Sequence, residues 1–208
     1  MDIGYIILAG GKSLRLGRDK KQETVGGITL LERVISVLSL LPGSHGKITI
    51  VTDVDSLIFL QVHYPDLKIV QDFYPGKGSS GAIFTGLSFS GAFHNLVVAC
   101  DMPFLNPDLL NYMIGIIAHN DIVAYRSKDN FEPLHAIYSK NCIIPLESII
   151  QNNLRIIELV NSVKVRYLNS DEIERFDSEN LSFFNVNTKA DLRAAKLIAF
   201  NQSCGRSN

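Results

Sequence analysis

Short apolar runs alternate with longer amphipathic segments through the first 120 residues. The runs predict buried strands, and apolar residues spaced every three or four positions predict the helices between them. Thr29 with Glu32 is typical of a capping box, and Asn106-Pro107 provides an N-cap followed by proline at the first helical position. The predicted strands are 4–9, 48–52, 67–71 and 95–100, and the predicted helices are 29–41, 55–63, one after a Gly/Ser loop at 76–81 that runs towards residue 89, and 107–119.

The pattern changes after residue 120. Two predicted strands, 122–125 and 134–138, flank a polar connection. Thr188 with Asp191 caps a last helix that we expect to end near Phe200. The other predicted elements are a helix at 142–151, an extended segment at 164–168 and a last short strand at 183–187.

Strands that are apolar on both faces and alternate with helices indicate an α/β protein with a doubly wound, mostly parallel sheet in three layers. No repeat, low-complexity segment or linker divides the chain. We therefore expect a single domain over residues 1–200 with halves at about 1–120 and 121–200, and a frayed tail at 201–208.

The amino-acid composition argues against several classes of function. Twenty Lys and Arg residues against 21 Asp and Glu residues leave a net charge of -1, which disfavours nucleic acid as a partner. Three separated cysteines without a C-x-x-C pair argue against a zinc ribbon or a disulfide framework. The sequence shows no signal peptide and no apolar run of the ~20 residues that span a membrane. We expect a cytoplasmic protein that uses neither a membrane nor nucleic acid.

The segment LAGGKSLRLGRDK (8–20) is the first candidate for chemistry. Gly10 and Gly11 follow the first predicted strand, where backbone N–H groups can approach a phosphate closely. The basic residues of the same loop are Lys12, Arg15, Arg18 and Lys20. The segment lacks the Lys-Ser/Thr ending of a Walker A loop. It is either a phosphate-binding loop or a glycine turn before a solvated basic loop.

Asp101 is the second candidate, because it follows the strand NLVVAC directly. A carboxylate at the carboxyl end of a buried strand can bind Mg²⁺, although an aspartate there can also cap a helix or begin a turn.

Other sequence patterns give weaker evidence of a functional site. The run GKGSSG (76–81) fits the dinucleotide fingerprint G-x-G-x-x-G, but residues 72–75 separate it from the preceding strand. Glu132 and His135 flank Pro133-Leu134, where a surface or core histidine is the simpler interpretation. Cys100 fits a small core residue, and Ser13 lacks a recognisable His and Asp set.

Five segments together resemble the molybdenum cofactor guanylyltransferase family of nucleotidyltransferases, whose fold is Rossmann-like and similar to glycosyltransferase A. In chain order, the segments are LAGGKSLRLGRDK, GKGSSGAIFTGL after Asp72, CDMPFLNPDLL, FEPLHAIYS (131–139) and FNVNTKADL (184–192). The resemblance implies Mg²⁺-dependent transfer of GMP from GTP to molybdenum-bearing molybdopterin, with release of pyrophosphate. It also implies a monomer whose partners are molybdenum-insertion or molybdoenzyme maturation proteins.

The resemblance also implies roles for residues. Lys20, Arg15 and Asp101 would be catalytic, and Asp101 would bind the metal. The nucleotide-binding residues would be Leu8, Ala9, Gly10, Gly11, Lys20, Asp72 and Asp101, within the half 1–120. Asn185 and Asn187 would bind the acceptor, within the half 121–200, and on a strand both amides would face one side.

Two segments depart from the family pattern. Residues 51–55 replace a common Asn-Arg pair, which leaves the nucleotide contact near Asp53 unassigned, and Ser79-Ser80 stand where Pro-Leu is usual. Ser79-Ser80 favour a cytidylyltransferase, whereas Gly10 is typical of the guanylyl branch. A sister nucleotidyltransferase and a non-catalytic nucleotide-binding module therefore remain alternatives.

Overall fold

The computed structural model describes residues 2–10, 23–127 and 130–205. Within these ranges, seven strands form the central sheet in the order β5-β4-β1-β6-β8-β7-β9. The strands are β1 (Ile3–Leu8), β4 (Ile48–Thr52), β5 (Lys68–Gln71), β6 (His94–Ala99), β7 (Ile122–Ser127), β8 (Asn130–Ser139) and β9 (Val165–Leu168). In the described part of this seven-stranded sheet, β8 alone runs antiparallel to its neighbours, which are β6 and β7.

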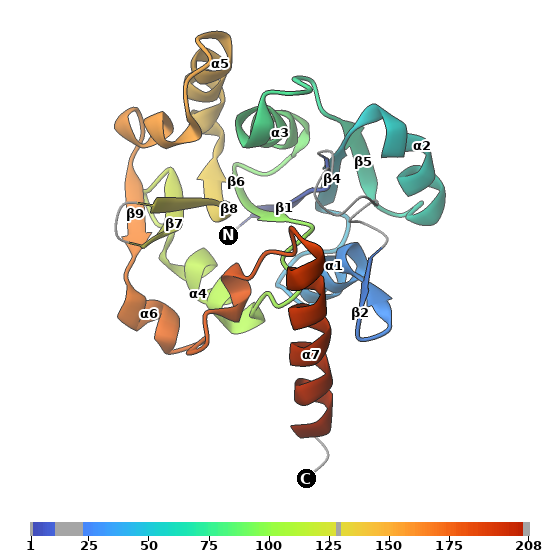
Figure 1. Cartoon of the computed structure of the whole chain (residues 1–208). Helices are drawn as coiled ribbons and strands as arrows, with labels where there is room; N and C mark the ends of the chain where they lie inside the picture. The colour runs from blue at the N-terminus through green and yellow to red at the C-terminus, as the bar shows by residue number, and fades with distance from the viewer. Residues whose placement is uncertain (1, 11–22, 128–129, 206–208) are drawn as a thin grey trace.

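Helices cover both faces of this sheet, which Figure 1 shows edge-on. The α-helices of the described residues are α1 (Leu30–Ser39), α2 (Val54–His63), α3 (Gly78–Phe89), α4 (Pro107–Ile116), α5 (Ile143–Gln151), α6 (Ser170–Glu174) and α7 (Lys189–Gly205). The buried side chains of α1, α4 and α6 form one cluster with one face of the strands, joined by Leu60 of α2. Those of α3 and α5 form a second cluster with the opposite face. The predicted three-layer, doubly wound α/β fold is confirmed.

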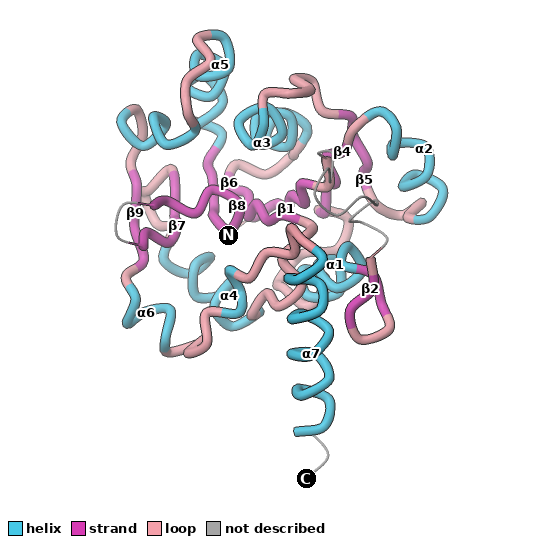
Figure 2. The backbone as a smooth tube through the Cα atoms, viewed as in Figure 1, coloured by secondary structure: helices cyan, strands magenta, loops and turns pink. Residues whose placement is uncertain are grey.

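A third, smaller cluster lies beside the sheet. Here α7 packs against the hairpin of β2 (Thr24–Val25) and β3 (Ile28–Thr29) through Val25, Leu30 and Ala195. Figure 2 shows α7 projecting from the body towards the C-terminus. None of the described helices is long and apolar enough to cross a membrane.

Three predicted helix starts are confirmed. The Thr29 side chain accepts the Glu32 N–H at 3.1 Å, and the Glu32 carboxylate accepts the Thr29 N–H at 2.7 Å, so the capping box is complete. The Asn106 side chain accepts the N–H groups of the first turn of α4. At α7, Thr188 Oγ1 accepts the Asp191 N–H at 3.2 Å. Local side-chain chemistry therefore sets these three boundaries.

The predicted strand at 183–187 is wrong. Residues 181–183 form the 3₁₀ helix η4 (Leu181–Phe183), and the chain after it pairs with no strand of the sheet. Phe184 packs against Phe104 with ring centroids 5.9 Å apart, and Val186 is buried in the α7 cluster. The alternating apolar residues of this segment pack against α7 and the loop after β6, so their period of two does not come from a sheet.

Three helix boundaries also differ from the prediction. Helix α3 begins at Gly78, so residues 78–81 are helical and lie outside the loop expected at 76–81. Helix α4 ends at Ile116, before the expected His119. Helix α7 continues to Gly205, which includes residues 201–205 of the expected tail, because the polar residues after Phe200 contain no proline to interrupt the hydrogen bonds.

The described part of the chain contains two further 3₁₀ helices. They are η2 (Lys140–Cys142), which leads into α5, and η3 (Ile156–Asn161), which connects α5 to β9.

Candidate functional site

The carboxyl ends of the parallel strands β1, β4, β5 and β6 meet at one edge of the sheet. The residues directly after these strands are Ala9, Asp53, Asp72 and, following Cys100, Asp101. In an open α/β sheet, ligands bind in the crevice outside this edge. The fold therefore brings together at one edge residues that lie up to 92 positions apart in the sequence, from Ala9 to Asp101.

Strand β1 lies between β4 and β6, which fixes the backbone of Leu8 and Ala9. The Ala9 N–H donates to Val51 O at 2.8 Å, and the Cys100 N–H donates to Leu8 O at 3.0 Å. Ala9 is buried, whereas Gly10 is exposed where the chain leaves the sheet. The predicted residues Gly11, Arg15 and Lys20 lie outside the described residues, as do Lys12, Ser13 and Arg18.

Gly10 has room for a side chain. A Cβ built on it would come no closer than 3.5 Å to the Asp53 backbone, which is ordinary van der Waals contact. Packing therefore does not require glycine at this position.

Asp72 connects β5 to α3. Its Oδ1 accepts the Tyr74 N–H at 3.0 Å and the Thr85 hydroxyl at 3.0 Å. The Phe73 N–H in turn donates to Thr85 Oγ1 at 3.0 Å. The half-buried carboxylate thus orders the β5–α3 connection, in addition to any contact with a ligand.

Asp53, in the segment that departs from the family pattern, caps a helix. Its Oδ1 accepts the Ser56 N–H at 2.9 Å at the start of α2. The Asp53 Oδ1 atom therefore has a structural function, as the cap of α2. The sequence analysis assigned no nucleotide contact near this residue.

Asp101 is half-buried at the same edge, and its Oδ1 atom is buried. Its backbone carbonyl accepts the Val186 N–H at 2.9 Å, which joins the end of β6 to the segment before α7. A carboxylate oxygen is a hard ligand of the kind Mg²⁺ prefers, and Mg²⁺ commonly uses one or two carboxylates together with phosphate and water. The donor chemistry of Asp101 therefore fits Mg²⁺. In the described part of the chain, no three His, Cys, Asp or Glu residues form a metal-binding group.

Glu132 is a further acidic residue at this edge, and the sequence analysis gave it no role. Burial raises the pKa of its carboxyl group, the hydrogen bond from the Leu134 N–H opposes this shift, and the negative charge of Asp101 adds to it. The alternation of apolar residues in β8 could not indicate that Glu132 lies at this edge, because β8 joins the sheet from a distant part of the sequence.

Asn185 and Asn187 do not share a strand face, because their segment is not a strand. Asn185 is half-buried, and its Nδ2 donates to Phe183 O at 3.1 Å. Asn187 is exposed, and its backbone N–H donates to the Asp191 carboxylate at 3.0 Å. The buried Val186 between them bonds to Asp101 O, so both asparagines flank the residue that contacts the carboxyl end of β6.

Side-chain bonds hold this segment against the loop after β6. Asp177 accepts the N–H groups of Leu181 and Ser182 at 2.9 and 2.7 Å. Ser182 Oγ accepts the Asn106 N–H at 3.0 Å, and Asn106 Nδ2 donates to Phe176 O at 2.7 Å. The position of Asn185 and Asn187 therefore depends on contacts between residues that are 70 and 76 positions apart.

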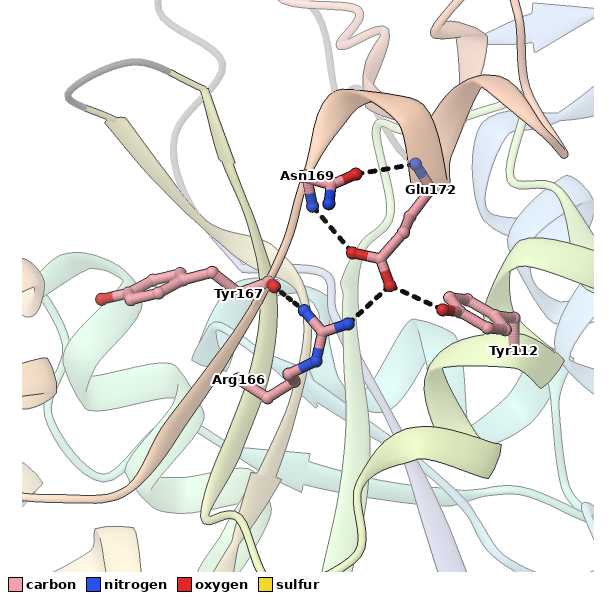
Figure 3. A network of polar contacts seen from close by, with 5 residues as sticks. All are labelled: Tyr112, Arg166, Tyr167, Asn169 and Glu172. Carbon is pink, nitrogen blue, oxygen red and sulfur yellow. Dashed lines mark hydrogen bonds and ion pairs between the residues drawn. The ribbon is translucent and has the colours of Figure 1, made fainter.

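A polar network anchors α6 upstream of this segment (Figure 3). Glu172 Oε1 accepts the Tyr112 hydroxyl at 2.6 Å and Arg166 at 2.5 Å, while Asn169 and Glu172 form a capping box. Arg166 also donates to Tyr167 O. Burial alone would raise the pKa of Glu172, but the bonds from Tyr112, Asn169 and Arg166 together lower it. The network joins α4, β9 and α6 and is structural.

His135 is a core residue, as the simpler interpretation of the sequence held. It is fully buried, and its ring lies 4.6 Å from that of Phe183, between centroids. Burial lowers the pKa of His135 to about 4. The ring is therefore neutral at physiological pH.

Backbone conformation and packing explain the three glycines of the G-x-G-x-x-G run at 76–81. Gly76 and Gly78 have positive φ angles of 86° and 62°, which favour glycine in the turn before α3. A Cβ on Gly81 would come within 2.8 Å of Tyr74 O, so this helix requires glycine for close approach. Strand β5 ends at Gln71 and α3 begins only at Gly78, so the tight strand-to-helix turn of the dinucleotide fingerprint is absent from this described segment.

Comparison with known proteins agrees with this geometry. Residues 5–162 match the model of the family described as the MobA-like NTP transferase domain. The chain is 33% identical over 202 residues to a protein of Pelotomaculum thermopropionicum named "probable molybdenum cofactor guanylyltransferase", covering 97% of this chain and 95% of that protein. It is 31% identical over 198 residues to the molybdenum cofactor guanylyltransferase of Desulfosudis oleivorans, covering 92% and 93%.

Solved structures are similar over the same length. Molybdopterin-guanine dinucleotide biosynthesis protein A from Archaeoglobus fulgidus superposes with a TM-score of 0.83 at 29% identity, covering 95% of this chain and 99% of that one. The 4-diphosphocytidyl-2C-methyl-D-erythritol synthase from Anaerococcus prevotii superposes with a TM-score of 0.71 at 18% identity, covering 96% of each chain. The second likeness shows the shared fold alone.

Proposed function

Because this chain belongs to the MobA-like NTP transferase family and is a nucleotidyltransferase, we propose that it transfers GMP from GTP to molybdenum-bearing molybdopterin. The products are the guanine dinucleotide form of the cofactor and pyrophosphate. Family membership confirms the resemblance found in the sequence motifs, and the enzyme class excludes the non-catalytic module considered there. The observation that carries the proposal is the near-full-length similarity to proteins named for this reaction, at about 30% identity.

The proposed nucleotide site lies at the carboxyl edge of β1, β5 and β6, within residues 1–120. Leu8, Ala9 and Gly10 supply a backbone held by β4 and β6, and Asp72 lies after β5. Gly11, Arg15 and Lys20 belong to the same proposed site by their position in the signature loop. Asp101 would hold Mg²⁺, which supplies charge neutralisation at the phosphates when it is bound.

The reaction needs little proton transfer from the protein. An oxygen of the acceptor phosphate attacks the α-phosphorus of GTP, the bond to the β-phosphate breaks, and pyrophosphate leaves. A phosphate monoester has its second pKa near ~6, so the acceptor is largely ionised at neutral pH. We therefore assign Lys20 and Arg15 to alignment of the phosphates and neutralisation of their charge, without a general base.

The proposed acceptor site involves Asn185 and Asn187, within residues 121–200. Side-chain amides offer both donors and acceptors, which suits the mixed polar edge of a pterin. The Val186–Asp101 bond supports this assignment, because it joins the segment of the two asparagines to the proposed metal-binding residue. We further propose that the enzyme acts as a cytoplasmic monomer that serves molybdenum-insertion or molybdoenzyme maturation proteins.

A matrix of nucleotides and acceptors tests the proposal. Pyrophosphate release is measured for GTP, CTP, ATP and UTP, each with molybdopterin bearing molybdenum and with Mg²⁺. We expect turnover with GTP and the molybdopterin acceptor to exceed all other combinations. Turnover of GTP only with a different phosphorylated acceptor would overturn the molybdopterin assignment and keep the nucleotidyltransferase class.

Cytidylyl transfer is the second candidate, and Ser79-Ser80 favour it. These serines occupy the first turn of α3, where the family commonly has Pro-Leu, and Ser80 is buried. A site matched to guanine leaves polar groups unpaired with cytosine, at about 1–3 kcal/mol for each group. We expect kcat/KM for GTP to exceed that for CTP with the same acceptor. Equal values or a preference for CTP would support the second candidate, and the Ser79→Pro, Ser80→Leu double variant then tests whether this turn sets the choice.

A further inference from the structure

His135 of β8 is fully buried, and neither of its ring nitrogens has a hydrogen-bond partner among the described residues. A neutral imidazole carries one N–H, and a buried donor without a partner costs stability. An apolar side chain of similar size would avoid this cost. Core stability therefore does not explain a histidine here, and buried groups of this kind are expected to serve function.

The strand pairing gives the face of the sheet on which His135 lies. His135 is opposite Val98 of β6, and Val98 and Ile137 belong to the cluster that α1, α4 and α6 form with the sheet. Side chains of a strand alternate between the two faces, so His135 shares this face with Ile137. Phe183 of η4 packs against the same cluster and contacts the His135 ring, with the ring centroids 4.6 Å apart.

Phe183 connects His135 to the proposed acceptor site. Its ring also contacts that of Tyr125 on β7, at 4.9 Å between centroids. Its backbone carbonyl accepts a hydrogen bond from Asn185 Nδ2 at 3.1 Å. Because residues 184–187 pair with no strand of the described sheet, packing of the Phe183 ring contributes to fixing the backbone that carries this carbonyl. The His135 ring therefore helps to hold the residue that orients the Asn185 amide.

We propose that His135 is a positioning residue of the acceptor site, which holds Phe183 in place so that the Phe183 carbonyl orients the Asn185 amide. The inference rests on the proposed function in taking Asn185 as an acceptor-binding residue. His135 acts through Phe183 and does not contact a substrate. A buried residue of β8 thus contributes to recognition of the acceptor and leaves binding of GTP unaffected.

The His135→Ala and His135→Phe variants test this proposal. Alanine removes the ring, and phenylalanine returns a flat ring that can contact Phe183. In His135→Ala we expect the KM for the molybdopterin acceptor to rise about fivefold, as for the loss of one aromatic contact, and the KM for GTP to stay unchanged. His135→Phe should return the acceptor KM to within about twofold of wild type.

A second measurement does not depend on turnover. In the nuclear magnetic resonance spectrum of the enzyme without substrates, the signal of the Asn185 side-chain NH₂ group should shift in His135→Ala. It should return towards its wild-type position in His135→Phe. The matched control is Ile137→Ala, because Ile137 is fully buried on the same face of β8. This control should lower the free energy of unfolding and change neither the acceptor KM nor the Asn185 signal.

The outcomes separate this inference from the proposed function. An unchanged acceptor KM and an unchanged Asn185 signal in a folded His135→Ala protein would overturn the inference, as would equal changes in Ile137→Ala. A shifted Asn185 signal with an unchanged acceptor KM would support the positioning and overturn the acceptor role of Asn185 in the proposed function. If His135→Ala does not fold, Phe183→Leu removes the other ring of the contact, and an unchanged Asn185 signal in that variant overturns the inference.

Discussion

The residues before and after position 120 build the sheet in different ways. In the first region, β4, β5 and β6 are each followed closely along the chain by an aspartate at the carboxyl edge, as with Asp72 after β5 and Asp101 after β6. In the second region, β8 enters antiparallel between β6 and β7, and Asn185 and Asn187 lie in an irregular segment held by distant residues. We propose that the first region binds the nucleotide and the second the acceptor.

The two regions fix the positions of their site residues in different ways. A residue at the end of a buried parallel strand is positioned by the hydrogen bonds of the sheet, which the local apolar run already specifies. Asn185 is positioned through Asp177 and Ser182 of its own segment, and Ser182 in turn bonds to Asn106, which lies 76 positions earlier in the chain. Substitutions in the two regions should therefore affect different steps of the reaction.

The largest effect should come from Asp101→Asn, which removes charge where the two regions meet. We expect kcat to fall about 10³-fold, because losing a metal-based charge clamp costs several kcal/mol of transition-state stabilisation. Pyrophosphate release and thermal unfolding are measured together, with the exposed Asp66→Asn as the matched control. Near-normal turnover by the folded variant would remove Asp101 from the mechanism.

The next largest effect should come from Lys20→Ala in the signature loop. We expect roughly 10²-fold loss of kcat/KM, against a few-fold loss for Lys12→Ala or Arg18→Ala, because one preorganised contact to developing charge is worth more than solvated positive charge. The three variants are compared by steady-state kinetics at varied GTP. Equal losses would indicate a diffuse positive field in place of a specific contact.

Two glycine substitutions in the first region distinguish a glycine that packing requires from one that packing does not require. Gly81→Ala places its Cβ 2.8 Å from Tyr74 O and should lower the free energy of unfolding by about 1–3 kcal/mol. Gly10→Ala meets nothing closer than 3.5 Å and should leave that free energy unchanged. Urea unfolding measures both.

The Gly10→Ala variant also tests the proposed preference for GTP over CTP. We expect Gly10→Ala to lower the ratio of kcat/KM for GTP over CTP, because the added methyl group lies where the chain leaves β1 towards the proposed nucleotide site. An unchanged ratio in a folded Gly10→Ala protein would show that Gly10 does not contribute to base choice.

The second region is tested by the Asn185→Ala, Asn187→Ala double variant. We expect the KM for the molybdopterin acceptor to rise about tenfold, because losing hydrogen bonds to a ligand costs about 1 kcal/mol each. The KM for GTP should not change. Parallel losses of GTP affinity, measured by calorimetric titration, would show that the segment supports the whole site and that the two regions do not act separately.

The smallest effect should be a pH dependence of stability from His135. Its pKa is lowered to about 4 in the folded protein, against an ordinary value of 6.5, so the unfolded chain binds the proton more readily. Its contribution is fully present above pH ~6.5 and is lost as the pH falls towards ~4. Between pH ~7.5 and ~5.5 we expect a loss of about 1 kcal/mol in the free energy of unfolding.

Urea unfolding at both pH values measures this loss. We expect His135→Leu to reduce the pH dependence, because the variant cannot take up the proton. The exposed His119→Gln should retain the wild-type dependence. An unchanged dependence in His135→Leu would assign the effect to other groups.

The candidate site was only partly predictable. Gly10, Asp72 and Asp101 follow apolar runs, so their place at one edge of a parallel sheet could be expected from the sequence. The position of the start of β8 beside the end of β6 could not, because it follows from β8 pairing with β6 in one particular register. The predicted strand at 183–187 failed for a related reason, since alternating apolar residues there meet Phe104 and α7.

The sequence by itself determined the order of the central-sheet strands and of the helices in the first region, the caps at Thr29, Asn106 and Thr188, and the family motifs. These features depend on local hydrogen bonds and on the periodicity of apolar residues, which neighbouring positions specify. Only the tertiary structure decided the antiparallel insertion of β8, the position of Glu132 at the carboxyl edge of the sheet and the course of residues 176–187. Contacts between residues far apart in the chain decide these features. A buried side chain can pack equally well against several partners, and only the complete fold determines which of them it meets.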